Sequence, residues 1–333
     1  MNEWYEEIKN SKTKKAMPIL SFPSTQLLNI TVRELINSSD NQSRGMYEVA
    51  KRTPKALASV SLMDLSVEAE CFGSTIVISD HEVPTVKGAI VTTLEEAEAL
   101  EVPKVGACRT GIYVEAIKKA KELIKDRPVL AGIIGPFSLA GRLVDVTEAL
   151  IDCYTEPEMM HEVLKKCTSF LKEYAKAYKS VGANGIVIAE PLAGLLSPDL
   201  MEEFSEPYVK ELIDEVQDEN FIVVYHNCGN TVIKTIDSIL RVGAKIYHFG
   251  NAIDMSEMLK HVPSDVVVMG NINPAKEFRN GTPESIRKAT LELMEKCCSY
   301  NNFVISSGCD IPPLSKWENI DAFFDAVDEF YSR

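Results

Sequence analysis

The chain has 333 residues, of which 45% are hydrophobic and 25% charged, a balance typical of a globular protein with a large core. Its formal net charge is −14 and it has no basic stripe, which argues against nucleic acid and anionic membrane surfaces as partners. No segment supplies the roughly 18 apolar residues of a membrane helix, so no membrane insertion is expected, and residues 1–11 lack the apolar core of a signal peptide. We therefore expect a cytoplasmic protein whose 8 cysteines are metal ligands or buried residues rather than disulfides.

Short β-branched segments alternate with longer amphipathic segments along the chain. Some of the short segments are continuous apolar runs, such as residues 221–225 and 266–269, as expected for parallel strands that helices cover. In chain order, the predicted strands are Met17–Phe22, Thr75–Ser79, Val129–Ile134, Gly185–Ala189, Phe221–Tyr225, Lys245–Phe249, Val266–Gly270 and Phe303–Ser306.

Capping residues mark the helices between these strands. Ser197 and Thr282 each precede a proline, the pattern of an N-cap followed by proline at the first helical position. Glycine follows two of the amphipathic segments, as at a helix C-terminus. The predicted helical segments include Val32–Asn37, Asp40–Val49, an insertion within Thr92–Asp126, Pro157–Val181, Thr231–Val242, Ile286–Cys298 and Ser315–Tyr331.

This alternation predicts an α/β fold. Eight strands with interleaved helices favour a single (β/α)8 TIM barrel over residues 1–333, with residues 1–74 as a helical excursion around the first strand. A doubly wound open sheet shares the alternation and is the alternative. The barrel is favoured because the strand count reaches eight without an interdomain linker.

Polar residues gather where the predicted strands end, which is where barrel enzymes carry their chemistry. In strand order these residues are Asp80 and His81, Glu190, His226 and Cys228, His248, Asn271 and Cys309.

A candidate metal site stands out among them. His226 and Cys228 are two residues apart, so in extended chain both side chains point the same way, and Gly229 then lets the chain turn away. With Cys309 they offer two thiolates and an imidazole, a set that suits zinc, and three protein ligands leave a position open for substrate. The alternative for each is an ordinary buried cysteine or a hydrogen-bonded histidine.

Four further residues have open roles. Glu190 and His248 are candidate catalytic residues, and Asp80 and Asn271 are candidate cofactor-binding residues. Glu190 is a fourth zinc ligand displaced by substrate, an acceptor for His226, or a structural acceptor beneath the next loop. His248 is alternatively a core histidine beside the site, and Asp80 alternatively caps a loop.

Several motifs resemble those of the uroporphyrinogen decarboxylase superfamily, and more closely those of its zinc-dependent methylcobamide:coenzyme M methyltransferase branch. They are His-Asn-Cys-Gly-Asn at 226–230, Gly-Asn-Ile-Asn-Pro at 270–274 and Ser-Gly-Cys-Asp-Ile-Pro-Pro at 307–313. The resemblance covers nearly the whole chain and implies a (β/α)8 barrel with His226, Cys228 and Cys309 as zinc ligands. True decarboxylases carry an arginine-rich motif near the N-terminus for the substrate carboxylates, whereas residues 17–26 contain no arginine.

The resemblance implies an enzyme of one-carbon metabolism. It would move a methyl group from methylcobalamin, free or on a corrinoid protein, to a small thiol such as coenzyme M. Homocysteine or tetrahydrofolate as acceptor, a decarboxylase-like lyase, and a non-catalytic corrinoid-binding subunit remain the alternatives. The sulfonate of coenzyme M requires a cation or backbone donors, for which Arg109 and Arg142 are candidates.

Overall fold

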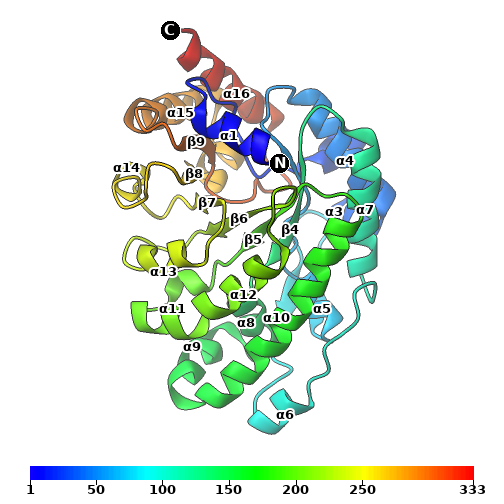
Figure 1. Ribbon diagram of the computed structural model, residues 1–333. Helices are drawn as coiled ribbons and strands as arrows, with labels where there is room; N and C mark the ends of the chain where they lie inside the picture. The colour runs from blue at the N-terminus through cyan, green and yellow to red at the C-terminus, as the bar shows by residue number, and fades with distance from the viewer.

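A computed structural model describes residues 1–333 as a curled parallel sheet with helices on its outer side (Figure 1). The seven strands of the sheet follow one another in the order β1-β4-β5-β6-β7-β8-β9. Their bounds are β1 Ser59–Val60, β4 Val129–Ile134, β5 Gly185–Ala189, β6 Ile222–Asn227, β7 Ile246–Phe249, β8 Val267–Ile272 and β9 Phe303–Ser307.

The predicted first strand, residues 17–22, occupies the eighth position of the ring as an extended segment without regular pairing. Met17 donates its N–H to the carbonyl of Ile305 on β9 at 3.1 Å, and Leu57, just before β1, donates to the carbonyl of Ala16 at 2.8 Å. The segment therefore lies between β9 and β1 and completes the ring. The predicted (β/α)8 architecture is confirmed, with an irregular first strand.

The prediction of the second strand at Thr75–Ser79 is wrong. Thr75–Val77 forms β2, which pairs antiparallel with β3 (Thr85–Lys87) in a ribbon separate from the barrel. The second barrel strand is β1, which pairs parallel with β4. Since β1 has only two residues, it shows no periodicity that a sequence pattern would detect, whereas the β-branched residues of β2 imitate a buried strand.

The remaining elements are helices, and every predicted helical segment overlaps at least one of them, although many helices lie outside the predicted segments. The segment 231–242 is helical only over Ile236–Arg241. The helices are α1 Asn2–Asn10, α2 Ser24–Leu28, α3 Val32–Ile36, α4 Ser39–Arg52, α5 Val67–Cys71, α6 Leu94–Ala99, α7 Thr110–Leu123, α8 Pro136–Val144, α9 Val146–Thr155, α10 Pro157–Ser180, α11 Pro198–Phe204, α12 Glu206–Val216, α13 Ile236–Arg241, α14 Met255–Met258, α15 Pro283–Cys297 and α16 Trp317–Ser332, with a 3-10 turn at Ala193–Leu195 and a π-helical turn at Pro274–Arg279. No helix is long and apolar enough to cross a membrane.

Alternate residues of each strand face two different cores. Inward side chains, such as Val187 on β5 and Ile222 and Val224 on β6, form a cluster inside the barrel. Outward side chains, such as Ile188 and Val223, join the larger cluster between sheet and helices. This alternation fixes which polar residues at the strand ends turn toward the barrel axis.

Helix α1 lies at the end of the barrel where the strands begin (Figure 1). Asn2 donates its N–H to the carbonyl of Glu219, shortly before β6, and the Tyr5 hydroxyl donates to the carbonyl of Asp265, shortly before β8. The polar strand-end residues therefore lie at the opposite end of the barrel.

Candidate metal centre

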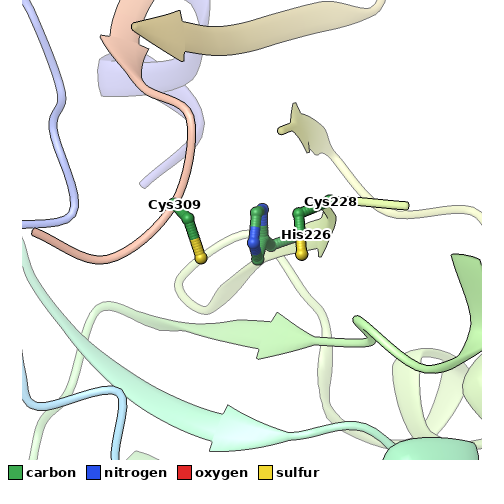
Figure 2. A group of neighbouring side chains, drawn as sticks. All are labelled: His226, Cys228 and Cys309. Carbon is green, nitrogen blue, oxygen red and sulfur yellow. The ribbon is translucent and has the colours of Figure 1, made fainter. Parts of the chain in front are cut away.

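His226, Cys228 and Cys309 converge at the carboxyl ends of β6 and β9 (Figure 2). One ligand atom from each residue lies within 4.8 Å of the other two. His226 has the same parity as the inward residues Ile222 and Val224, so the strand geometry turns its imidazole toward the barrel axis. The spacing is close to what a single small ion requires.

The neighbours of His226 leave one of its nitrogens without a partner. Parallel pairing sets His226 beside His248 on β7, and the two Nδ1 atoms lie 2.7 Å apart. The Nε2 atom of His226 is buried and has no hydrogen-bond partner. Because a buried polar atom without a partner is costly, this nitrogen fits a metal ligand better than a core histidine.

The two thiols of the group behave as a pair. The neighbouring Cys309 thiol, together with the nearby His226, lowers the pKa of Cys228 although burial opposes the shift. The neighbouring Cys228 thiol, with burial, raises the pKa of Cys309. Two sulfur atoms beside an imidazole suit a soft divalent ion.

Glu190 lies on the other face of β5. Its parity is opposite to that of the inward Val187 and Ala189, and it is fully buried. One carboxylate oxygen accepts the N–H of Ser138 in the first turn of α8 at 3.1 Å. Gly135 makes room for it, because a Cβ there would lie 1.9 Å from that oxygen. These contacts match the third of the roles considered for Glu190, a structural acceptor beneath the next loop.

Burial raises the pKa of Glu190 to about 8, from an ordinary value of 4.5. The folded protein holds the Glu190 proton more tightly than the unfolded chain does. The contribution of this group to the free energy of unfolding is therefore fully present below pH 4.5 and is lost as the pH rises through about 8. We expect the free energy of unfolding to fall by an amount on the order of 3 kcal/mol more between pH 6 and pH 9 in the natural protein than in Glu190→Gln. Urea titrations at several pH values measure this difference.

The control for that experiment is Glu148→Gln on the exposed first turn of α9, which should keep the pH dependence of the natural protein. Equal slopes for the natural protein and Glu190→Gln would contradict a raised pKa at Glu190. A part of the slope remains in both proteins, because burial also raises the pKa of Glu68 to about 7.

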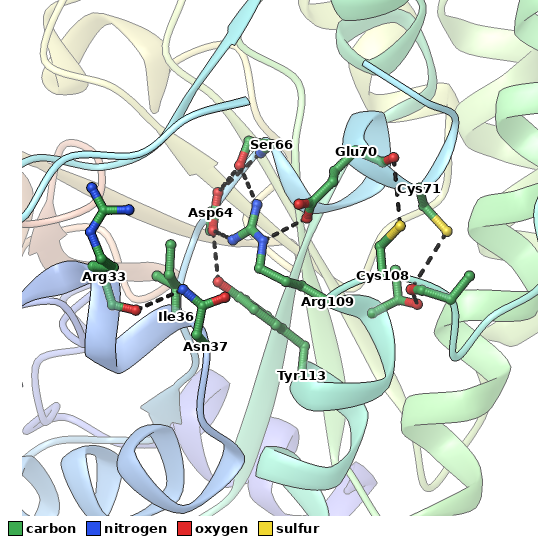
Figure 3. A network of polar contacts seen from close by, with 12 residues as sticks. Arg33, Ile36, Asn37, Asp64, Ser66, Glu70, Cys71, Cys108, Arg109 and Tyr113 are labelled. Atoms are coloured by element: carbon green, nitrogen blue, oxygen red, sulfur yellow. Dashed lines mark hydrogen bonds and ion pairs between the residues drawn. The ribbon is translucent and has the colours of Figure 1, made fainter. Parts of the chain in front are cut away.

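A charge network connects residues that follow β1 with Arg109 and Tyr113 at the start of α7 (Figure 3). Arg109 donates to Asp64 at 2.5 Å, to Glu70 at 2.6 Å and to the hydroxyl of Ser66 at 2.8 Å. The Tyr113 hydroxyl also donates to Asp64, at 2.7 Å. Arg109, a sequence candidate for sulfonate binding, therefore has its guanidinium occupied by acidic partners.

The two candidate cofactor-binding residues have different settings. Asp80 is exposed and pairs with Arg33 at 2.8 Å, and since Thr75–Ser79 is not a barrel strand, Asp80 does not end one. Asn271 ends β8 as expected and is 8% exposed. Its amide group donates to the carbonyls of Gly250 and Ile253 at 2.9 and 3.0 Å, which ties the loop after β7 to β8 and leaves its Oδ1 without a hydrogen bond.

No sequence pattern indicates a role for two acids, Asp64 and Asp310. Asp64 follows a strand of only two residues, and because no sequence pattern marks so short a strand, Asp64 is not recognisable as a strand-end residue. Asp310 follows Cys309 directly in a motif that the sequence did single out, and one of its carboxylate oxygens is buried without a partner. Burial raises the pKa of Asp310, and the charge of Asp64 adds to the shift.

The fold and the site together define an α/β-barrel enzyme with a candidate metal centre at the carboxyl ends of its strands. The chain belongs to the uroporphyrinogen decarboxylase family, because the family model described as Uroporphyrinogen decarboxylase (URO-D) matches residues 14–330.

Two curated relatives represent different branches of the family. The methylcobamide:CoM methyltransferase MtbA of Methanosarcina acetivorans is 27% identical over 271 residues, which cover 80% of this chain and 78% of the relative. A uroporphyrinogen decarboxylase of Prochlorococcus marinus is 28% identical over 234 residues, 66% of this chain and 64% of the relative. The resemblance to the methyltransferase branch is thereby confirmed.

Solved structures agree with the barrel fold. A methyltransferase from Methanosarcina mazei superimposes with a TM-score of 0.85 at 22% identity, covering 97% of this chain and 96% of the other. A B12-independent methionine synthase from Shewanella sp. W3-18-1 superimposes with a TM-score of 0.63 at 14% identity, covering 96% of each chain.

Proposed function

We propose that this protein transfers a methyl group from a methylated corrinoid to a small thiol, with His226, Cys228 and Cys309 as the ligands of a catalytic zinc ion. The observation that carries the proposal is the convergence of these three ligand atoms within 4.8 Å, with the Nε2 atom of His226 unpartnered. The methyltransferase relatives support the reaction class.

The donor set fits thiol activation. Held by His226, Cys228 and Cys309, a zinc ion would act as a Lewis acid that lowers the pKa of an acceptor thiol, so that its thiolate would be available at neutral pH. Two cysteine sulfurs offset the charge of the ion, so the acceptor sulfur keeps electron density for attack. The reaction forms a sulfur–carbon bond and breaks the cobalt–carbon bond, whose electron pair stays on cobalt.

The remaining candidate residues have roles around this centre. Asn271 has a free Oδ1 at the end of β8, and we assign it, with Asp80 on the outer loop, to contacts with the corrinoid or its carrier protein. Of the two candidate cations for a sulfonate, Arg109 is occupied. Arg142 on α8 forms no ion pair or hydrogen bond, and burial lowers its pKa, so we assign the acceptor's anionic group to Arg142.

The decisive experiment is zinc X-ray absorption with and without candidate thiols. We expect one zinc ion per chain with two sulfur ligands, and a third sulfur on addition of 2-mercaptoethanesulfonate. Ethanesulfonate, which lacks the thiol, is the control and should leave the spectrum unchanged. If homocysteine were the only thiol to add a sulfur ligand, homocysteine would be the acceptor. If no thiol changed the spectrum, the proposal of thiol activation would be refuted.

A further inference from the structure

A chain of hydrogen bonds runs from the first barrel segment to His226. The Ser306 hydroxyl on β9 lies 2.7 Å from the carbonyl oxygen of Met17 and 2.8 Å from Nε2 of His248. The other nitrogen of His248, Nδ1, lies 2.7 Å from Nδ1 of His226. Ser306 and His248 are completely buried and His226 is 2% exposed, so water has little access to the chain of contacts.

The hydrogens in this chain have a single consistent arrangement. A carbonyl oxygen cannot donate, so the one hydrogen of the Ser306 hydroxyl lies toward Met17. The serine oxygen must then accept from His248, which places the His248 hydrogen on Nε2. The side-chain contacts of the His248 ring are this hydroxyl and Nδ1 of His226, so the second contact decides where the remaining hydrogen lies.

Nδ1 of His226 lies 3.3 Å from the carbonyl oxygen of His248, which can only accept, so Nδ1 of His226 carries a hydrogen. Nδ1 of His248 lies 2.7 Å from that donor and accepts the hydrogen bond, so Nδ1 of His248 itself has no hydrogen. With its hydrogen on Nδ1, His226 has a bare Nε2, the atom that has no partner in the protein.

We infer that Met17, Ser306 and His248 form a tautomer lock, which holds His226 with its Nε2 lone pair free for the metal. His248 is on this view a positioning residue rather than a catalytic one, and the irregular first strand takes part through the Met17 carbonyl. The inference rests on the proposed function only in the identity of the ion. The tautomer itself is a property of the metal-free protein.

The first test is nitrogen NMR of metal-free protein labelled with ¹⁵N-histidine, which is tractable because the chain has only 5 histidines. We expect His226 as the Nδ1–H tautomer and His248 as the Nε2–H tautomer. In Ser306→Ala, His248 loses its fixed acceptor and both rings should show mixed tautomers. A hydrogen on Nε2 of His226 in the natural protein would overturn the lock.

The second test is zinc affinity by competition with a chromophoric chelator. Hydrogen-bond partners of a ligating histidine typically contribute about 10–100-fold in metal affinity, and we expect a loss of this size in Ser306→Ala and His248→Phe. His248→Gln should restore most of the affinity, because its amide both accepts and donates.

The matched control is Ser307→Ala, which removes an equally buried neighbouring hydroxyl that accepts the N–H of Ile19 and does not touch His248. It should leave the tautomers and the affinity unchanged. If Ser306→Ala kept the zinc affinity of the natural protein and the same tautomers of His226 and His248, the tautomer lock would be refuted. A natural protein that binds no zinc would refute the proposed function, while the NMR result would still decide the lock.

Discussion

Replacing Cys309 by alanine should remove both the bound zinc and the methylation of a thiol. In the proposed function the three ligands hold one ion. A structural zinc site with four ligands is worth about 10–16 kcal/mol, so one ligand contributes roughly 3 kcal/mol, or on the order of 100-fold in affinity. The variant leaves His226 and Cys228 in place, and the fold has little reason to change because Cys309 lies in the loop after β9.

The measurements are zinc content after dialysis and methyl transfer from methylcobalamin to 2-mercaptoethanesulfonate. The matched control is Cys298→Ala, which removes a thiol of similar burial at the end of α15. This thiol is hydrogen-bonded to the Tyr331 hydroxyl and does not belong to the candidate metal centre. The control should keep both metal and activity. Full zinc content and full activity in Cys309→Ala would show that Cys309 is not a ligand.

Replacing Arg109 by methionine should strongly destabilise the protein. Asp64 has no exposed side-chain area, and its carboxylate would lose its only cationic partner. Breaking a buried ion pair from one side typically costs about 3–5 kcal/mol, because the other charge stays buried and uncompensated. Urea denaturation followed by circular dichroism measures the loss.

Two further variants separate this effect from loss of packing. Arg287→Met breaks an exposed pair with Glu329 and should change stability little. The double variant Asp64→Asn with Arg109→Met removes both charges and should be more stable than Arg109→Met alone. If Arg109→Met were as stable as the natural protein, the charge network of Arg109 and Asp64 would contribute nothing to the stability of the fold.

The sequence predicted most of the barrel because its parallel strands are buried on both faces. Continuous apolar runs such as those in β4 and β6 can be recognised as buried strands from the sequence alone. The failure at β1 has the same physical origin. A strand of two residues carries no pattern, while the β-branched ribbon strand β2 carries a misleading one.

The sequence by itself determined which residue types end the strands, including the histidine and two cysteines of the candidate metal centre. Only the tertiary structure decided what each of them faces. Glu190 and His226 end adjacent strands, yet opposite parity turns one toward α8 and the other toward the barrel axis. The contacts of His248 with Ser306, and of Arg109 with Asp64, join residues 58 and 45 positions apart. Local patterns report composition and period, and such contacts arise only when the barrel closes.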